Sequence, residues 1–258
     1  MLNLKRTEVE IKDKLVTVWL NQTGIRNALN LSLIEELIKV FEWISSRKEI
    51  MSILLRGRGK SFCAGADINW MMDSGSLRYE DCYRDSKKLA ACYKTIFQSE
   101  KVVINLVHGD VYGGALGFLG AGDFTFALKN TRFRLPELNL GLVPAVIMPY
   151  LLTRVRPADI KYQIFTGGIF TAEEAQKMGF IEKVCEDIDD LELKADELIQ
   201  KINSASPKAL AKTKNLFRAL NKNLINSGNI KKTVKTITRL KISDDARERM
   251  SGFLSGNK

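Results

Sequence analysis

The chain has 258 residues, of which 45% are hydrophobic, and its formal net charge is +10. This length can bury one large core or a core with a small appendage, and the composition is that of a globular rather than a disordered protein. No window is apolar for long enough to cross a bilayer, and the N-terminal residues contain no secretory signal. We therefore expect a cytoplasmic protein that does not associate with membranes.

The four cysteines, Cys63, Cys82, Cys92 and Cys185, show no metal-ligand spacing, so we expect reduced thiols and no metal site. The positive charge is concentrated in the last quarter of the chain. From Lys201 onward 14 Lys and Arg stand against 3 Asp and Glu, whereas the first 200 residues carry 26 against 27. These basic residues follow amphipathic helices without interleaved aromatic residues, so we do not expect nucleic acid as the partner. A solvated helical face and a surface that steers an anionic partner both remain open.

In chain order, alternating apolar residues predict a hairpin over 7–20. Ser32 and Glu35 form a candidate capping box for a helix whose apolar stripe ends at Ile44. A strand over 50–56 follows, and then a helix over 75–98 that is entered through a flexible segment, 73–76. Strands are predicted over 102–107, 124–128 and 132–135, with a glycine-rich turn and a helix between the first two.

Thr171 and Glu174 form a second candidate capping box, and the helix that they begin should end at Gly179. Beyond Asp189 the pattern is almost entirely helical, with a break at 203–207. Strand–strand–helix units followed by helices predict an α/β protein with a helical appendage. We place the division at residue 200, with the site in 1–200 and a basic helical domain in 201–258.

Two turns rich in small residues each follow a strand, one over 60–68 and the other over 109–118. A strand that breaks at small residues and then opens a helix leaves backbone N–H groups free to bind an anion. The second turn has neither GxxxxGK[ST] nor GxGxxG, so a nucleotide loop is not expected. Singly, each is an ordinary strand-to-helix turn. Together they could direct two donors at one oxygen that becomes an enolate, each donor contributing ~3 kcal/mol to transition-state stabilisation.

Six segments in order resemble the crotonase (enoyl-CoA hydratase/isomerase) superfamily. They are Arg26–Asn30, Phe62–Ile68, His108–Gly109 with Gly113–Gly114, Phe133–Gly141, Thr171–Ile181 and Ser243–Leu254. The resemblance implies a crotonase-like spiral of ββα turns. It also implies a C-terminal helical trimerisation region, which gives a homotrimer or a dimer of trimers.

The resemblance also implies roles for individual residues. Glu137 matches the family's second catalytic glutamate, which moves the proton on the carbon beside the thioester carbonyl and needs an apolar pocket to bring its pKa toward neutrality. Ala66 and Gly114 match the two oxyanion N–H donors. The substrate-binding set that we expect is Arg26, Ala28, Ala64, Asp67, Ile68 and Gly113, with Asp67 bracing its turn rather than reacting.

The sequence departs from the family pattern at Gly117, where typical hydratases place their first glutamate. A simple two-carboxylate hydratase is therefore not expected. A single base could shuttle a proton in a double-bond isomerase. It could also run a syn elimination, in which it removes the C2 proton and returns it to the departing hydroxide.

The segment 141–154, taken with 113–118, resembles the crotonase-type dehydratases of polyketide β-branching cassettes. Those act on 3-hydroxy-3-methylglutaryl groups on acyl carrier protein and give 3-methylglutaconyl thioesters. We therefore expect this dehydration, with the substrate on the phosphopantetheine of an acidic carrier protein or on CoA, and no other cofactor. The alternatives are a CoA-dependent isomerase, a methylglutaconyl-CoA hydratase, or a non-catalytic scaffold that binds acyl carriers or RNA.

The remaining candidates have more modest expected roles. Cys63 is expected to be a packed thiol, and His108, the only histidine, to make a structural hydrogen bond. A cation should bind the substrate's distal carboxylate, and the candidates are Lys60, Arg132 and Arg134. The residues expected to steer an acidic carrier protein are Lys208, Lys212, Lys214 and Arg218.

Overall fold

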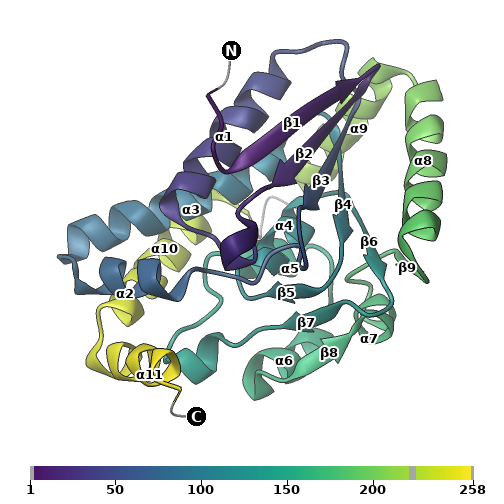
Figure 1. Ribbon diagram of the computed structural model, residues 1–258. Coiled ribbons are helices and arrows are strands. Elements are labelled where there is room, and N and C mark those ends of the chain that lie inside the picture. The colour runs from purple at the N-terminus through teal and green to yellow at the C-terminus, as the bar shows by residue number, and fades with distance from the viewer. Residues whose placement is uncertain (1–2, 221–224, 257–258) are drawn as a thin grey trace.

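The computed structural model describes residues 3–220 and 225–256. A six-stranded sheet runs through the molecule in the order β1–β2–β3–β4–β6–β9 (Figure 1). Its strands are β1 (Thr7–Lys12), β2 (Leu15–Leu20), β3 (Ser52–Gly57), β4 (Val102–Val107), β6 (Phe124–Leu128) and β9 (Lys183–Cys185). The predicted hairpin is β1 and β2, which pair antiparallel, and every later pair in this sheet is parallel.

A second sheet has three short strands in the order β5–β7–β8 and lies at the lower end of the large sheet (Figure 1). These strands are β5 (Asp110–Tyr112), β7 (Arg132–Arg134) and β8 (Ile169–Thr171). The glycine-rich segment 109–118 therefore contains a strand before its helix, which the sequence prediction missed. Three residues are too few for an alternating pattern to stand out.

The large sheet has a hydrophobic core on each face, because alternate residues of its central strands point in opposite directions. Ile53 and Leu55 of β3 face the larger core with α1 (Leu31–Ser45). Leu54 and Ile104 face the smaller core, which α8 (Ile188–Ser204) covers with Leu191, Ala195, Ile199 and Ile202. The continuous apolar runs in β3 and β4 are typical of strands buried on both faces.

The other helices surround this frame. They are η1 (Thr23–Ile25), α2 (Ile68–Ser76), α3 (Tyr79–Gln98), α4 (Ala115–Ala121), η2 (Glu137–Leu140), α5 (Met148–Leu151), α6 (Pro157–Thr166), α7 (Ala172–Lys177), α9 (Pro207–Leu220), α10 (Ser227–Lys241) and α11 (Asp244–Leu254). The ββα architecture expected from the resemblance is present, and within the described ranges no helix is both long and apolar enough to cross a membrane.

The last two helices share the larger core. α10 packs against α2 and α3, and α11 packs against α2 and η2. Val234, Ile237, Ala246 and Met250 belong to the same buried cluster as the sheet residues. The division at residue 200 and the trimer stay predictions, and residues 221–224 and 257–258 of the proposed C-terminal domain lie outside the described residues.

Two local predictions are wrong. α1 begins at Leu31 and is capped by Asn30, whose side chain accepts a 3.0 Å hydrogen bond from the Leu33 N–H, while Glu35 pairs with Lys88 instead of capping. The segment 73–76 is the last turn of α2 rather than a flexible entry, and α3 begins only at Tyr79. Asn30 lies directly before α1 and caps it, whereas Ser32 lies within the helix, and residues 73–76 continue α2 as a helix. Neither local pattern therefore determined the structure that forms. The Thr171–Glu174 capping box is confirmed.

Candidate active site

Backbone pairing brings the two small-residue turns together. Cys63 forms a parallel bridge with Val111, in which the Cys63 N–H donates to Asp110 O and the Tyr112 N–H donates to Cys63 O, both at 3.2 Å. A second bridge joins Ala66 to Leu29. The first turn thus lies between residue 29 on one side and strand β5 on the other.

Glycines permit this close approach. Gly65 has φ +97°, and a Cβ placed there would lie 2.8 Å from Tyr112 O. Gly113 has φ +50°, and its N–H donates to Arg134 O at 2.8 Å, which holds the second turn against β7. Both backbones adopt conformations that L side chains disfavour, so the two turns need glycine at these positions.

The Ala66 and Gly114 amides are free donors. Among the residues that the structure describes, neither N–H donates a hydrogen bond, although their neighbours do. Ala66 immediately precedes Asp67, the N-cap of α2, and Gly114 is the N-cap of α4. Two unpaired amides at the starts of two helices can receive an anionic oxygen, as an oxyanion hole requires.

Glu137 lies beside the second turn, where it begins η2 directly after Pro136. Its Oε1 would be 3.1 Å from a Cβ on Gly113, so the missing side chain of that glycine leaves room for the carboxyl group. The residue as a whole is partly accessible, but Oε2 is fully shielded and has no hydrogen-bond partner among the described residues. Burial raises the pKa of Glu137 to about 7, against a smaller lowering by a backbone hydrogen bond. Such a carboxyl can both take and return a proton near neutral pH.

The position of the missing first glutamate is filled. A Cβ on Gly117 would lie 2.5 Å from Ile147 Cγ2 and 2.7 Å from two ring carbons of Tyr93. Tyr93 is fully buried, and its ring packs edge-on against Phe118. The space over Gly117 is therefore occupied by packed side chains, and no carboxyl group stands at this position.

Tyr93 also touches the oxyanion turn. Its hydroxyl donates to Gly114 O at 2.7 Å, and the same oxygen accepts from the Gly117 N–H at 2.9 Å. Burial raises the pKa of Tyr93, which keeps the hydroxyl protonated as a donor. Sequence reasoning missed this residue, because a tyrosine on the buried stripe of a helix is typical of ordinary core packing.

The expected substrate-binding residues gather at the same edge. The Ala64 N–H donates to Arg26 O at 3.0 Å, and Ala28 is buried next to this contact. Arg26 itself points outward, 62% exposed, and pairs with Asp110 at 3.1 Å. The Asp67 carboxylate caps α2 by accepting from Asn69 N–H at 2.9 Å, as a bracing role requires. Ile68 begins α2 and is half-buried.

The other sequence candidates make structural contacts. The Cys63 thiol is fully buried and its pKa is raised to about 12 by burial, as suits a packed thiol. His108 Nε2 lies 2.9 Å from Gly59 O in a structural hydrogen bond. Arg132 is held on the surface by Asp110, and Arg134 donates from Nε to Gly167 O at 2.7 Å. Arg132 is therefore engaged by a carboxylate of the protein, and the Arg134 guanidinium is fixed by its Nε.

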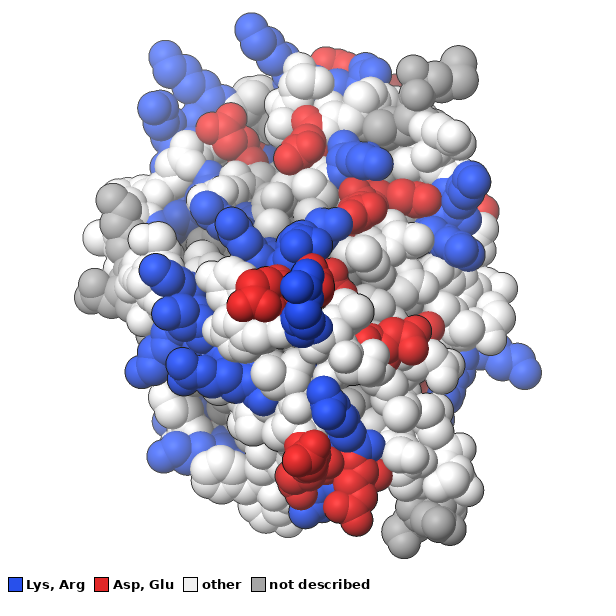
Figure 2. Space-filling view, turned by 90° about the vertical axis from the view of Figure 1, so that its left-hand side faces the viewer, with Lys and Arg blue, Asp and Glu red and all other residues white. Residues whose placement is uncertain are grey.

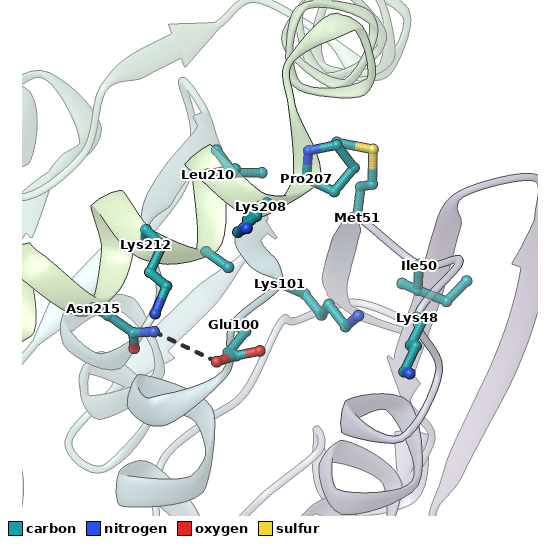
Figure 3. Close-up of a pocket in the computed structure, with 11 residues that line it drawn as sticks. Lys48, Ile50, Met51, Glu100, Lys101, Pro207, Lys208, Leu210, Lys212 and Asn215 are labelled. Carbon is teal, nitrogen blue, oxygen red and sulfur yellow. Dashed lines mark hydrogen bonds between the residues drawn. The ribbon is translucent and has the colours of Figure 1, made fainter.

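A cavity of about 400 Å³ lies at the opposite end of the large sheet (Figure 3). Its lining residues 50, 51, 100 and 101 precede strands β3 and β4, whereas the two turns follow those strands. The ammonium-bearing residues around it are Lys48, Lys101, Lys208 and Lys212. Because parallel strands separate the two edges, this basic cavity is not part of the carboxyl site.

Two residues expected to steer a carrier protein serve the fold instead. Lys214 is largely enclosed and pairs with Asp123 at 2.5 Å, and Arg218 donates to Phe97 O at 3.1 Å and Ser99 O at 3.2 Å. Both attach α9 to the body of the protein. Lys208 and Lys212 are exposed, but they lie at the edge of the sheet away from the two turns. These four basic residues of α9 are therefore poor candidates for guiding a carrier protein to the two turns and Glu137.

Comparison with known proteins agrees with this geometry. The family model for enoyl-CoA hydratase/isomerase matches residues 10–258. Enoyl-CoA hydratase AKT6-1 of Alternaria alternata is 29% identical over 203 residues, which are 79% of this chain and 66% of that protein, so the match spans just under two thirds of this relative. A short-chain-enoyl-CoA hydratase of Clostridium acetobutylicum is 31% identical over 219 residues, 83% of this chain and 81% of the relative.

Solved structures show the same likeness. The crystal structure of an enoyl-CoA hydratase from Mycobacterium avium superposes with a TM-score of 0.88 at 28% identity, and covers 98% of this chain and 97% of that one. The fold is shared along nearly the whole chain. The two free amides and the enclosed glutamate also agree with membership of one family. By its sequence and its structure, the chain belongs to the enoyl-CoA hydratase/isomerase family.

Proposed function

We propose that the protein is a hydro-lyase that dehydrates a 3-hydroxy-3-methylglutaryl thioester to the 3-methylglutaconyl thioester, with the acyl group on an acyl carrier protein. The observation that carries this proposal is the single enclosed carboxyl of Glu137 beside the free amides of Ala66 and Gly114. The resemblance of residues 109–154 to β-branching dehydratases supplies the substrate.

The reaction balances with one carboxyl group. The Glu137 carboxylate takes the C2 proton, and the negative charge moves onto the thioester oxygen, where the Ala66 and Gly114 N–H groups stabilise it. The electron pair then returns to form the C2–C3 double bond as the C3–O bond breaks. The departing hydroxide takes the proton back from Glu137 and leaves as water, so the carboxylate is regenerated.

The filled space over Gly117 favours a mechanism with one carboxyl group over the two-carboxylate mechanism of typical hydratases, because no second carboxyl is present there to orient a water molecule. A double-bond isomerase also needs only one base and is the second candidate, favoured by the same observation. A non-catalytic scaffold would gain nothing from an enclosed carboxyl whose burial disfavours ionisation.

Mass spectrometry, combined with proton NMR, separates these candidates. The acyl group is presented on carrier protein, on pantetheine and on CoA, and the mass of each product is followed. A loss of about 18 Da, the mass of one water molecule, from the carrier-bound substrate supports the proposal. Migration of a double bond in an enoyl substrate leaves the mass unchanged, so it is followed by proton NMR, and its detection supports the isomerase. No change in any substrate would exclude both.

Charge steering by an acidic carrier is expected to act at the edge that holds the two turns. Lys60 is exposed there and has no ion-pair partner within the described ranges. In low salt, Lys60→Glu should lower kcat/KM for carrier-bound substrate severalfold more than for the pantetheine substrate, and added salt should shrink the difference, because exposed charges are screened beyond ~8 Å. The matched control is Lys208→Glu on α9, at the other edge. Equal effects of the two substitutions would contradict steering at this edge.

Tyr93→Phe should lower kcat by roughly tenfold with little change in KM, because the Gly114 carbonyl loses one of its two donors and the neighbouring oxyanion amide becomes less well fixed. The buried hydrogen bond contributes about 1 kcal/mol to stability. Tyr150→Phe is the matched control, since the Tyr150 hydroxyl is buried without a partner in the described part of the chain. Steady-state kinetics and thermal unfolding of both variants check this, and an unchanged kcat in Tyr93→Phe would refute the bracing role.

A further inference from the structure

A buried lysine belongs to α10, which packs against α2 and α3 at the left of Figure 1, the side that faces the viewer in Figure 2. Lys241, the last residue of α10, is 3% exposed, and its Nζ has no hydrogen-bond partner among the described residues. The ammonium lies 4.7 Å from the centre of the Trp70 ring. A ring face offsets only part of the cost of burying an unpaired charge, which is several kcal/mol.

A second buried donor lies beside Lys241. Trp70 Nε1 is also buried without a hydrogen-bond partner in the described part of the chain. The buried hydroxyls of Ser74 and Ser86 interact with the Cys82 thiol, whose pKa responds both to them and to Lys241. The ammonium of Lys241 and the indole N–H of Trp70 are therefore unpaired, whereas most buried polar atoms of a native protein are paired.

The chemistry of this cluster is one-sided. The ammonium offers three donors and the indole one, and neither can accept, whereas each hydroxyl can both donate and accept, so none of these four groups carries a negative charge to balance the ammonium. The charge of Asp85 acts on Lys241, but no ion pair between them is present in the described ranges. Desolvation lowers the pKa of Lys241. A ligand that completes the cluster must bring acceptors and a negative charge.

Helices α2 and α3 connect the cluster to the oxyanion amides. α2 runs away from Ala66 and carries Trp70 and Ser74 one turn apart. After a two-residue link, α3 returns with Ser86 and, seven residues on and on the same face, Tyr93. Seven residues correspond to about 10 Å along α3, so the cluster lies about two helical turns from the tyrosine that contacts the Gly114 turn.

We propose that Lys241, with Trp70 and the hydroxyls of Ser74 and Ser86, binds the carboxylate at the far end of the acyl group. This inference rests on the proposed function, because it names the residues that select a substrate whose acyl chain ends in a negative charge. It replaces Lys60, Arg132 and Arg134, which lie at the surface or are engaged elsewhere. The partly accessible Trp70 indole forms the boundary of this subsite.

The test compares two pantetheine thioesters that differ at one group. One carries 3-hydroxy-3-methylglutarate, and the other carries the same acyl chain with its distal carboxylate converted to a primary amide. Wild-type protein should dehydrate the carboxylate substrate with a kcat/KM roughly 100-fold higher than that of the amide. Lys241→Met should bring this ratio close to 1, whereas Lys235→Met, on the exposed side of α10, should keep it.

Ser86→Ala serves if Lys241→Met does not fold, because it removes one small donor from α3, and it should lower the ratio by about 3–10-fold. A wild-type ratio near 1, or a Lys241→Met ratio equal to that of wild type, would overturn the distal-carboxylate site while the dehydration stands. Absence of water loss from both substrates in the wild type would instead overturn the proposed function. The two failures are therefore distinguishable.

Discussion

Replacement of Glu137 by glutamine is expected to lower kcat by about 10²–10⁴-fold, because the amide keeps the shape of the side chain but cannot accept the C2 proton. Binding of the acyl thioester should persist, since the Ala66 and Gly114 amides are untouched. Single-turnover rates, with substrate affinity measured separately, check the expectation. Glu197→Gln on α8 is the control, because that glutamate is exposed on the far face of the large sheet.

The pH dependence follows from the same group. Burial raises the pKa of Glu137 to about 7, and the reaction begins from the carboxylate, so kcat/KM should fall as the pH drops through 7. A rate that is flat between pH 5 and 8 would show that another group is the base.

The stability of the folded protein should change with pH in the opposite sense to kcat/KM, so that it is lower at high pH. The folded protein holds the Glu137 proton up to a pKa of about 7, whereas the unfolded chain releases it near the ordinary value of 4.5. Wild-type stability therefore falls as the pH rises from 4.5 to 7, by about 3 kcal/mol at most. Glu137→Gln removes this cost, so the variant should unfold at a higher temperature than wild type at pH 8, and the difference should close toward pH 4.5. Equal melting temperatures at pH 8 would contradict the enclosed state of the carboxyl group.

Gly117→Glu, which restores the glutamate of typical hydratases, is expected to prevent stable folding rather than add a second catalytic carboxyl. Even a Cβ would lie 2.5 Å from Ile147 Cγ2 and 2.7 Å from the Tyr93 ring. Overpacking of this kind costs about 1–3 kcal/mol, and an unpaired carboxylate in the same place adds its desolvation. Soluble yield and thermal unfolding measure the effect.

The smaller change isolates the steric part of this effect. Gly117→Ala should lower the free energy of unfolding by about 1–3 kcal/mol, and Gly24→Ala is the control because nothing lies within 4 Å of a Cβ there. Shortening the nearest neighbour should relieve the clash, so Ile147→Ala and Gly117→Ala should cost less together than the sum of their separate costs. Additive costs would mean that the two positions do not meet.

The local patterns of the sequence determined much of the frame. Alternation predicted the β1–β2 hairpin, and Thr171 with Glu174 predicted the start of α7, because both features depend on residues two to four positions apart. The same local chemistry identified the two turns whose amides are unpaired. The family resemblance singled out Glu137, and burial gives that carboxyl the pKa that its expected role requires.

Tertiary packing decided what the site contains. Tyr93 reaches Gly114 and Gly117 from a helix more than twenty residues earlier, and Lys241 meets Trp70 from the other end of the chain. In the sequence each is an ordinary residue on an amphipathic helix, and nothing local marks it. The packing of helices on a sheet decides which side chains, distant in the sequence, come into contact. Glycine at position 117 therefore showed by itself only that one carboxyl was missing, whereas the fold showed that Tyr93 and Ile147 occupy its space.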